Sequence, residues 1–221
     1  MSTNQIQGRN PARRVLACEF NDSTIIRKEG DEEMSPNMQV LRTGVLANRV
    51  LLVGTLTKVH SSQDGSSKSG EITDPSGDVS PELNDDGDII NNSHSTSKFS
   101  VNGHKEYGPK TFQFLSQFEK SDKPATYVGV VGKPSVYSPE DDDRKFVNLR
   151  PEMISEITKE QRNRALCEIC SKTINRINTF QSRLQNGDAV VDEVMTGYER
   201  GDDLTRYRNG CLSAINNILH D

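Results

Sequence analysis

Two cysteines stand at a spacing that binds metal ions in other proteins. Cys167-Glu-Ile-Cys170 is a C-x-x-C pair, and thiolates at this spacing bind zinc when a second pair or two histidines complete a tetrahedron. The two remaining cysteines and the four histidines stand at no matching spacing. Cys170 also falls on the apolar stripe of a predicted helix, where a thiol packs like a small apolar side chain. We therefore expect buried structural cysteines, with no metal and no other cofactor.

The segment Gly129-Val-Val-Gly132-Lys133 has some features of a phosphate-binding loop. The spacing of that motif is not met, and Pro134 stands where a serine or threonine would reach Mg²⁺. The acidic run at 140–143 could hold a hard cation, but such a run is typical of a solvated loop. The sequence contains no nucleophile elbow, zinc-protease motif or dinucleotide fingerprint. It gives no reason to predict an enzyme, and no catalytic residue is assigned.

Aromatic and basic residues fall on one predicted outer face. If Val147 and Leu149 point to a core, their strand neighbours point outward, because side chains alternate along a strand. Such a face binds single strands by stacking bases on aromatic rings and attracting phosphates. The candidate nucleic-acid-binding residues are Arg42, Arg49, Lys58, Tyr127, Lys133, Phe146, Asn148 and Arg150. The alternative is that the two aromatic side chains pack under C-terminal helices while the cations are only solvated, and a one-residue slip would exchange the faces.

The elements that must position these residues are mainly strands. Strands are predicted at 15–20, 50–59, 70–77, 99–102, 126–133 and 146–150, with a helix at 109–118. Gly54 inside a β-branched run suggests a bulge or tight bend, and Asp74-Pro75-Ser76-Gly77 has the residues of a turn. A helix between the third and fourth of five strands is the order of an OB-fold. We therefore predict a mainly β fold, an OB-fold five-stranded Greek-key barrel followed by C-terminal helices.

The spacing of apolar residues changes from strand-like to helical after Pro151. Lys159–Gln185 carries an apolar stripe at helical spacing, with Thr158 and Gln161 placed as a capping box and Asn186-Gly187 placed to end the helix. Shorter helices are expected around 189–198 and 203–219. A stripe of this length needs a covering surface. Either the two following helices cover it, or a partner subunit does.

Composition bounds the organisation of the chain. Of 221 residues, 32% are hydrophobic and 27% charged, with no tryptophan, which favours a modest core and a sizeable disordered fraction. The net charge of −5 is uneven, because residues 61–98 hold eight acidic and two basic residues. We expect a disordered N-terminus at 1–10, an OB-fold domain at 11–157 with a disordered insertion at 78–98, and a helical region at 158–221.

The N-terminal segment is polar, without the apolar region of a signal peptide, and no apolar run approaches the roughly 18 residues of a membrane span. The scattered cysteines fit a reducing compartment, so a cytoplasmic location is expected.

Five collinear motifs resemble one protein family. They are PARRVLACEFNDST at 11–24, LRTGVLANRVLLVGTLT at 41–57, DPSG at 74–77, YVGVVGKP at 127–134 and VNLRPEMI at 147–154. Together they are similar to the archaeal replication protein A-associated proteins. The resemblance implies an OB-fold protein that associates with a replication protein A subunit and helps to handle single-stranded DNA in replication and repair. Subunits of replication protein A associate through helices after an OB-fold, which implies that Ile169, Ile174 and Ile177 lie at or beside a subunit contact in a hetero-oligomer.

Two functions remain open at this point. The first is a module that binds single-stranded DNA together with a replication protein A subunit. The second is a scaffold subunit of that complex with no direct DNA contact. The acidic balance of the chain favours the scaffold, whereas the aromatic and basic outer face favours the DNA-binding module.

Overall fold

The computed structural model describes residues 11–30, 35–77, 79–83, 89–94, 96–139, 144–201 and 203–220. The expected disordered N-terminus at 1–10 and the acidic run at 140–143 lie outside these residues. Among the described helices, none is long and apolar enough to cross a membrane.

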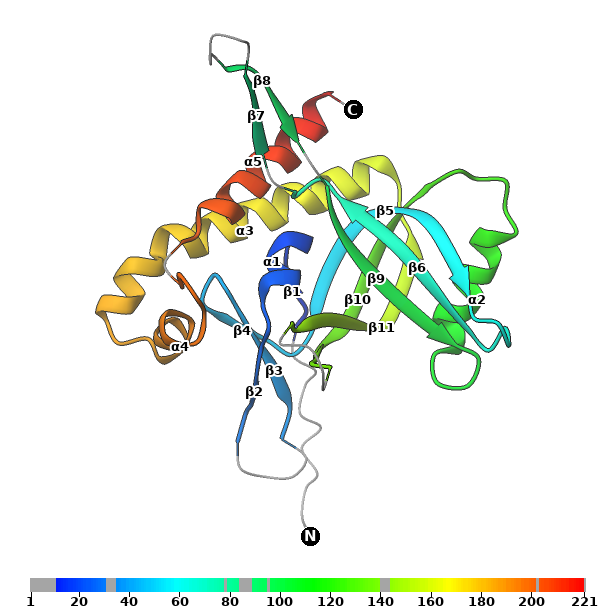
Figure 1. The fold of residues 1–221 in the computed structure, drawn as a ribbon, viewed down its shortest axis with the longest axis horizontal. Coiled ribbons are helices and arrows are strands. Elements are labelled where there is room, and N and C mark those ends of the chain that lie inside the picture. Colours follow the sequence, from blue (N-terminus) through cyan, green and yellow to red (C-terminus); the bar gives the residue numbers. More distant parts are fainter. Residues whose placement is uncertain are drawn as a thin grey trace.

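Five strands close into a barrel (Figure 1). Their spatial order is β5–β10–β11–β9–β6, and β6 pairs back onto β5. Every pair is antiparallel except β9–β11, which is parallel. The predicted OB-fold is confirmed, because this is its strand order and a helix separates its third and fourth strands. The elements are β5 (Val50–Ser61), β6 (Ser67–Asp74), β9 (Ser97–His104), α2 (Pro109–Glu119), β10 (Thr126–Tyr137) and β11 (Phe146–Glu156).

The long strand β5 closes the barrel by pairing on both edges. Its first half pairs with β10 and its second half with β6, with a register shift between Leu56 and Lys58. Gly54 lies where the two pairings meet. A Cβ added there would stand 2.5 Å from the Thr73 carbonyl oxygen, so only glycine fits this close approach. The close approach at Gly54 therefore lets β5 pair with both β10 and β6 and so close the barrel.

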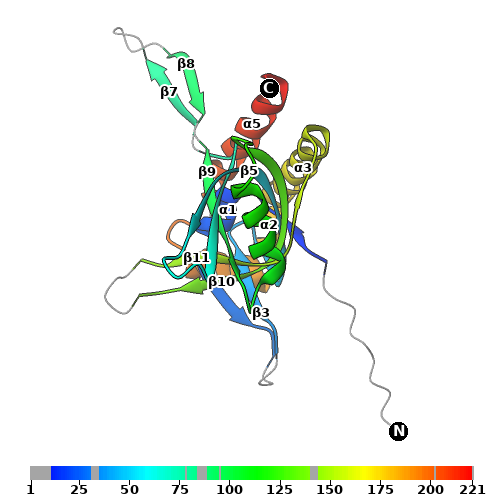
Figure 2. The same cartoon turned by 90° about the vertical axis from the view of Figure 1, so that its right-hand side faces the viewer.

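Alternating strand residues fill the barrel, and two helices cover its ends. The interior includes Leu52, Leu56, Ile72, Phe99, Val101, Val128, Val130 and Leu149, all buried. Leu115 of α2 and Phe20 of α1 (Ala17–Asp22) join the same core. Figure 2 shows α2 lying across one end of the barrel.

The predicted strand at 15–20 is wrong, because most of this segment forms the helix α1. All six of its residues are buried, so the alternation of Leu16, Cys18 and Phe20 marks no single face. The first amides of a helix need acceptors from outside it. The Ala17 N–H donates to the Asp74 carboxylate at 2.7 Å and the Cys18 N–H to the Ser76 hydroxyl at 3.2 Å. Residues of the distant β6 turn thus cap this helix.

A small antiparallel sheet beside the barrel did not emerge from the sequence. It contains β2 (Ile25–Lys28), β3 (Asn37–Leu41) and β4 (Val45–Ala47), in that order. The short β1 (Arg13–Arg14) pairs in parallel with β5. In Figure 1 the β2–β3 hairpin extends below the barrel. Strands of three to five residues carry too little pattern to predict.

The C-terminal helices share a core with the barrel. They are α3 (Lys159–Gln185), α4 (Ala189–Gly197) and α5 (Thr205–His220), and the capping box predicted at Thr158 and Gln161 is present. Ile169 and Ile177 are buried with Val53 of the outer barrel wall and with residues of α4 and α5. Ile174 is half-buried against the same cluster. The two following helices therefore cover the stripe, as in the predicted alternative, and Ile169 and Ile177 are unavailable to a partner.

The insertion expected to be disordered at 78–98 contains a hairpin. Its described part forms β7 (Val79–Leu83) and β8 (Ile89–His94), which pair antiparallel. The hairpin projects away from the barrel in both views (Figures 1 and 2). Ser97 and Lys98, placed in the same insertion, begin the barrel strand β9.

Candidate nucleic-acid interface

The outer side of the β10–β11 hairpin carries three opposed pairs of side chains. Tyr137 stands opposite Phe146, Ser135 opposite Asn148 and Lys133 opposite Arg150. Opposed residues of antiparallel strands have Cβ atoms about 4.5–5.5 Å apart. We call this set of six the hairpin face. The structure brings together Lys133, Phe146, Asn148 and Arg150 of the predicted residues, because the expected alternation places all four outward.

Each end of the hairpin face offers a different chemistry. Tyr137 is 59% exposed and Phe146 43% exposed, so both rings present a surface on which bases can stack. The Arg144 guanidinium lies 5.7 Å from the centre of the Phe146 ring. Lys133 and Arg150 form no ion pair within the described part of the chain. An aromatic end and a cationic end therefore lie about 13 Å apart, four residues along the strand.

Tyr127 points outward as predicted but lies under the helical tail. The Arg162 guanidinium of α3 stacks over its ring at 4.9 Å from the ring centre. Arg162 is itself only 4% exposed. For Tyr127 the structure therefore matches the alternative in which the aromatic side chain packs beneath the C-terminal helices.

The predicted cations near the first strands do not reach the hairpin face. Arg42 donates to the Tyr207 hydroxyl and the Glu199 carbonyl and lies over the Tyr198 ring, so it fastens the helical tail. Arg49 is mostly buried in an ion pair with Glu152 at 2.5 Å. Lys58 is exposed but lies beyond the end of the β5–β10 pairing, opposite Glu71. Tertiary contacts that no local pattern encodes determine these positions.

The face of the second and third barrel strands, which OB-folds commonly use for nucleic acid, is polar here. The outward side chains of β6 and β9 include Ser69, Glu71, Lys98 and Asn102, and Glu71 pairs with Lys98 at 3.0 Å. Both strands are fully described, and their outward side chains include no Phe, Tyr or Trp, although His104 at the end of β9 stacks on Tyr107 of the following loop. Among the strands of the barrel, the exposed Tyr and Phe rings therefore lie on the β10–β11 hairpin.

One exposed aromatic residue away from the hairpin face was missed in the sequence. Tyr107 is 86% exposed and stacks on His104, with ring centres 4.9 Å apart. It lies in the loop before α2, at the opposite end of β9 from the start of β11. An isolated tyrosine in a polar loop gives no periodic signal.

The C-x-x-C pair is divided between the surface and the core. Cys167 is exposed, whereas Cys170 is buried. Cys170 faces Cys211 of α5, and each sulfur lies 3.8 Å from the backbone carbonyl oxygen of the other residue. The expectation of two buried cysteines is thus correct for Cys170 and wrong for Cys167. Within the described residues no cluster of His, Cys, Asp and Glu has the arrangement of a metal site.

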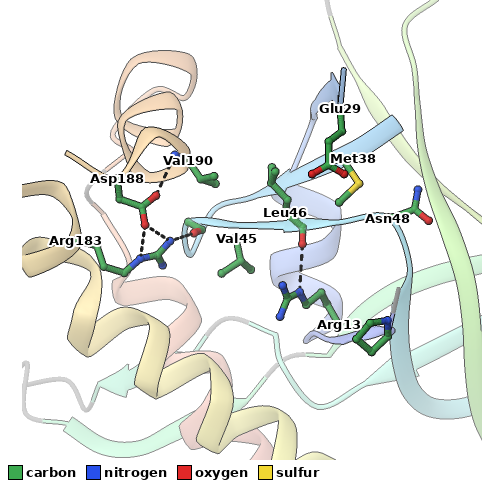
Figure 3. Close-up of a pocket in the computed structure, with 11 residues that line it drawn as sticks. Arg13, Glu29, Met38, Val45, Leu46, Asn48, Arg183, Asp188 and Val190 are labelled. Atoms are coloured by element: carbon green, nitrogen blue, oxygen red, sulfur yellow. Dashed lines mark hydrogen bonds and ion pairs between the residues drawn. The ribbon is translucent and has the colours of Figure 1, made fainter. Parts of the chain in front are cut away.

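A cavity of about 420 Å³ lies between β4 and the start of α4. Figure 3 shows the residues that line it. Arg183 in its wall pairs with Asp188 and donates to the Gly44 carbonyl. Arg13 donates to the Leu46 carbonyl. Both cations are therefore engaged in holding the small sheet to neighbouring elements.

Comparison with protein-family models and with curated protein sequences found no match. Among solved structures, a small single-stranded DNA-binding protein from Streptomyces coelicolor is similar over 51% of this chain and 95% of its own, at 13% identity and a TM-score of 0.30. A Plasmodium falciparum SSB in complex with ssDNA covers 50% and 95%, at 7% identity and a TM-score of 0.31. The S. pombe Stn1-ten1 complex covers 83% and 96%, at 10% identity and a TM-score of 0.38. Similarities this weak add no argument, so the OB-fold assignment rests on the strand order and closure of this chain's own barrel.

Proposed function

We propose that the chain is a non-enzymatic accessory protein that binds single-stranded DNA through the hairpin face. The observation that carries this proposal is the opposed pair Tyr137 and Phe146, both exposed. They share a strand surface with Lys133 and Arg150, which form no ion pair with any described residue. The motif resemblance to archaeal replication protein A-associated proteins supports action beside a replication protein A subunit in replication and repair.

The expected binding mode follows from the two ends of this face. A base stacked on an aromatic side chain contributes about 1–3 kcal/mol. Each phosphate neutralised by a cation adds about 0.7 to the slope of log affinity against log salt for single strands. The net charge of −5 opposes long-range attraction of DNA. We therefore expect a short, salt-sensitive site with little sequence preference.

Fluorescence anisotropy with labelled oligo-dT over a salt series tests the proposal. The double variant Tyr137→Ala/Phe146→Ala is expected to bind at least tenfold more weakly, since each lost stack costs about 1–3 kcal/mol. Lys133→Ala/Arg150→Ala is expected to reduce the salt slope by about 1.4. Tyr107→Ala is the matched control, because it removes an exposed tyrosine from another surface. Thermal melting checks that each variant is folded. Unchanged affinity in the aromatic double variant would contradict the proposal.

A scaffold role in the replication protein A complex is the second candidate, and one observation favours it. Leu212 and Leu219 of α5 are 57% and 71% exposed, and the half-buried Ile215 lies between them on the same helical stripe. This surface would replace the buried Ile169 and Ile177 as the contact with the partner. The same titration, together with co-purification, separates the two functions. A scaffold would co-purify with the replication protein A subunit. In that case the salt-sensitive DNA affinity of the chain and of the complex would not depend on Tyr137 and Phe146.

A further inference from the structure

A groove runs between the small sheet and the β10–β11 hairpin. Two cavities of about 260 and 400 Å³ adjoin there and share Asn37, Pro134 and Ser135 in their walls. We call it the inter-hairpin groove. Asn37 of β3 and Thr24, which precedes β2, line one side of the groove. Lys133 of β10, Arg150 of β11 and Lys145, which precedes β11, line the other side.

The described residues that line the groove carry charge of one sign. They include the cations Lys133, Lys145 and Arg150 and no carboxylate. Within the described part of the chain Lys133, Lys145 and Arg150 form no ion pair, although ten other lysines and arginines there are paired with acids. Like charges gathered without counter-charges repel one another. An anion bound between them would relieve that repulsion.

The opposite wall supplies neutral hydrogen-bonding groups. Thr24 contributes a hydroxyl and Asn37 an amide, which are side chains that contact phosphate and sugar oxygens without reading the base. One wall thus carries positive charge and the other carries neutral groups. This combination suits an extended anionic backbone.

We propose that the inter-hairpin groove binds the phosphodiester backbone of single-stranded DNA as it continues beyond the hairpin face. Lys133, Ser135 and Arg150 belong both to the hairpin face and to the groove, so a strand stacked on Tyr137 and Phe146 passes directly into it. The inference rests on the proposed function and extends it. The small sheet lies outside the five-stranded barrel and acts as an added wall that lengthens the footprint on DNA.

The test compares oligo-dT of graded length, from about 4 to about 16 nucleotides, the range of site sizes per OB-fold. The wall variant Thr24→Glu/Asn37→Asp places two negative charges on the opposite side of the groove and leaves the aromatic pair Tyr137 and Phe146 unchanged. The wild-type affinity is expected to rise with length and then level off. The wall variant is expected to lose that gain, with similar binding of the shortest oligomers and at least tenfold weaker binding of the longest.

Two further variants keep the result interpretable. Ser171→Glu/Asn175→Asp adds the same charge to exposed positions of α3, so it separates an effect of the groove from an effect of net charge. Lys145→Glu, on the opposite wall, is expected to show the same length-dependent loss as the wall variant. Thermal melting confirms folding in each case.

The outcomes distinguish the groove from the hairpin face. If Tyr137→Ala/Phe146→Ala weakens binding while the wall variant and Lys145→Glu match the wild type at every length, the groove inference is overturned and the proposed function stands. If the aromatic variant binds like the wild type, the proposed function fails. A loss for the α3 control equal to that of the wall variant would also overturn the inference, since net charge would then explain it.

Discussion

At the scale of single residues, the candidate site depends on which side chains meet across two strands. Tyr137 lies outside the strand predicted at 126–133, yet β10 continues through Pro134 to Tyr137. Pairing with β5 stops at Gly132, so Pro134 stands where β10 has only one partner strand. A proline is tolerated at such an edge because no neighbour needs its missing N–H. The extension places Tyr137 opposite Phe146.

A second residue with a role beyond its local segment is Asp74. Its buried carboxylate accepts hydrogen bonds from the backbone N–H groups of Ala17 and Ser76 and from the Ser76 hydroxyl. Burial raises the pKa of Asp74 from 3.8 to about 6, although these hydrogen bonds favour the charged form. The folded chain therefore binds this proton more readily than the unfolded chain.

This raised pKa predicts a pH dependence of stability. The contribution of Asp74 to the free energy of unfolding is largest below about pH 4. It falls as the pH rises to about 6 and is constant at higher pH. Over that window the change is roughly 3 kcal/mol. Asp74→Asn should remove the slope, measured as the free energy of urea unfolding between pH 4 and 7. The exposed Asp122→Asn is the control. Parallel curves for wild type and Asp74→Asn would show that Asp74 does not titrate there.

At the scale of elements, closure of the barrel depends on the bend in β5. The strand twists from β10 to β6 over twelve residues, and the carbonyl of Thr73 approaches its backbone at Gly54. Glycine weakens the interior of a strand, but here it permits a close backbone contact that any side chain would block.

Gly54→Ala is therefore expected to strain the β5–β6 pairing. The new Cβ would stand 2.5 Å from the Thr73 oxygen and 2.7 Å from Ile72 Cγ2, and overpacking of this kind costs about 1–3 kcal/mol. Thermal or urea unfolding measures the loss. Gly129→Ala in β10 is the matched control, because a Cβ there would meet only Ile157 at an ordinary 3.6 Å. Equal stability of the two variants would contradict this account of closure.

At the scale of the whole molecule, the barrel and the C-terminal helices share a buried core, from which we expect them to fold as one unit. Leu16, Val40 and Val53 share a core with residues of α3, α4 and α5. A buried ion pair crosses the same boundary. Glu19 of α1 is fully buried and pairs with Arg176 of α3 at 2.8 Å, and the Thr43 hydroxyl bonds both side chains. Buried contacts therefore cross the boundary expected at 157–158.

The ion pair between Glu19 and Arg176 can be used to test whether the barrel and the helices depend on each other for stability. Arg176→Met leaves the Glu19 carboxylate buried without its cation, and removing one partner of a buried pair costs about 3–5 kcal/mol. The double variant Arg176→Met/Glu19→Gln should recover much of that loss, because no buried charge remains. Urea unfolding followed by far-ultraviolet circular dichroism should show one transition for barrel and helices together. Two separate transitions in the wild type would contradict a shared core.

The sequence by itself determined the features that have a local signal. The strands of the barrel and the long helix were predictable because alternation and helical spacing are read within one segment, and the capping box spans only Thr158 to Gln161. The outward placement of Lys133, Phe146, Asn148 and Arg150 followed from the same period of two. The order of strands and helix was enough to predict the OB-fold.

Only the tertiary structure decided the features that depend on residues far apart in the chain. Asp74 and Ser76 cap α1 from 57 and 58 positions away, so the alternation at 15–20 indicated the wrong element. Arg42 and Arg49 were drawn to α5 and β11, and Ile169 and Ile177 were covered by the chain's own helices. Strand register placed Tyr137 opposite Phe146. Such pairings depend on which distant segments pack together, and no pattern within a single segment records that choice.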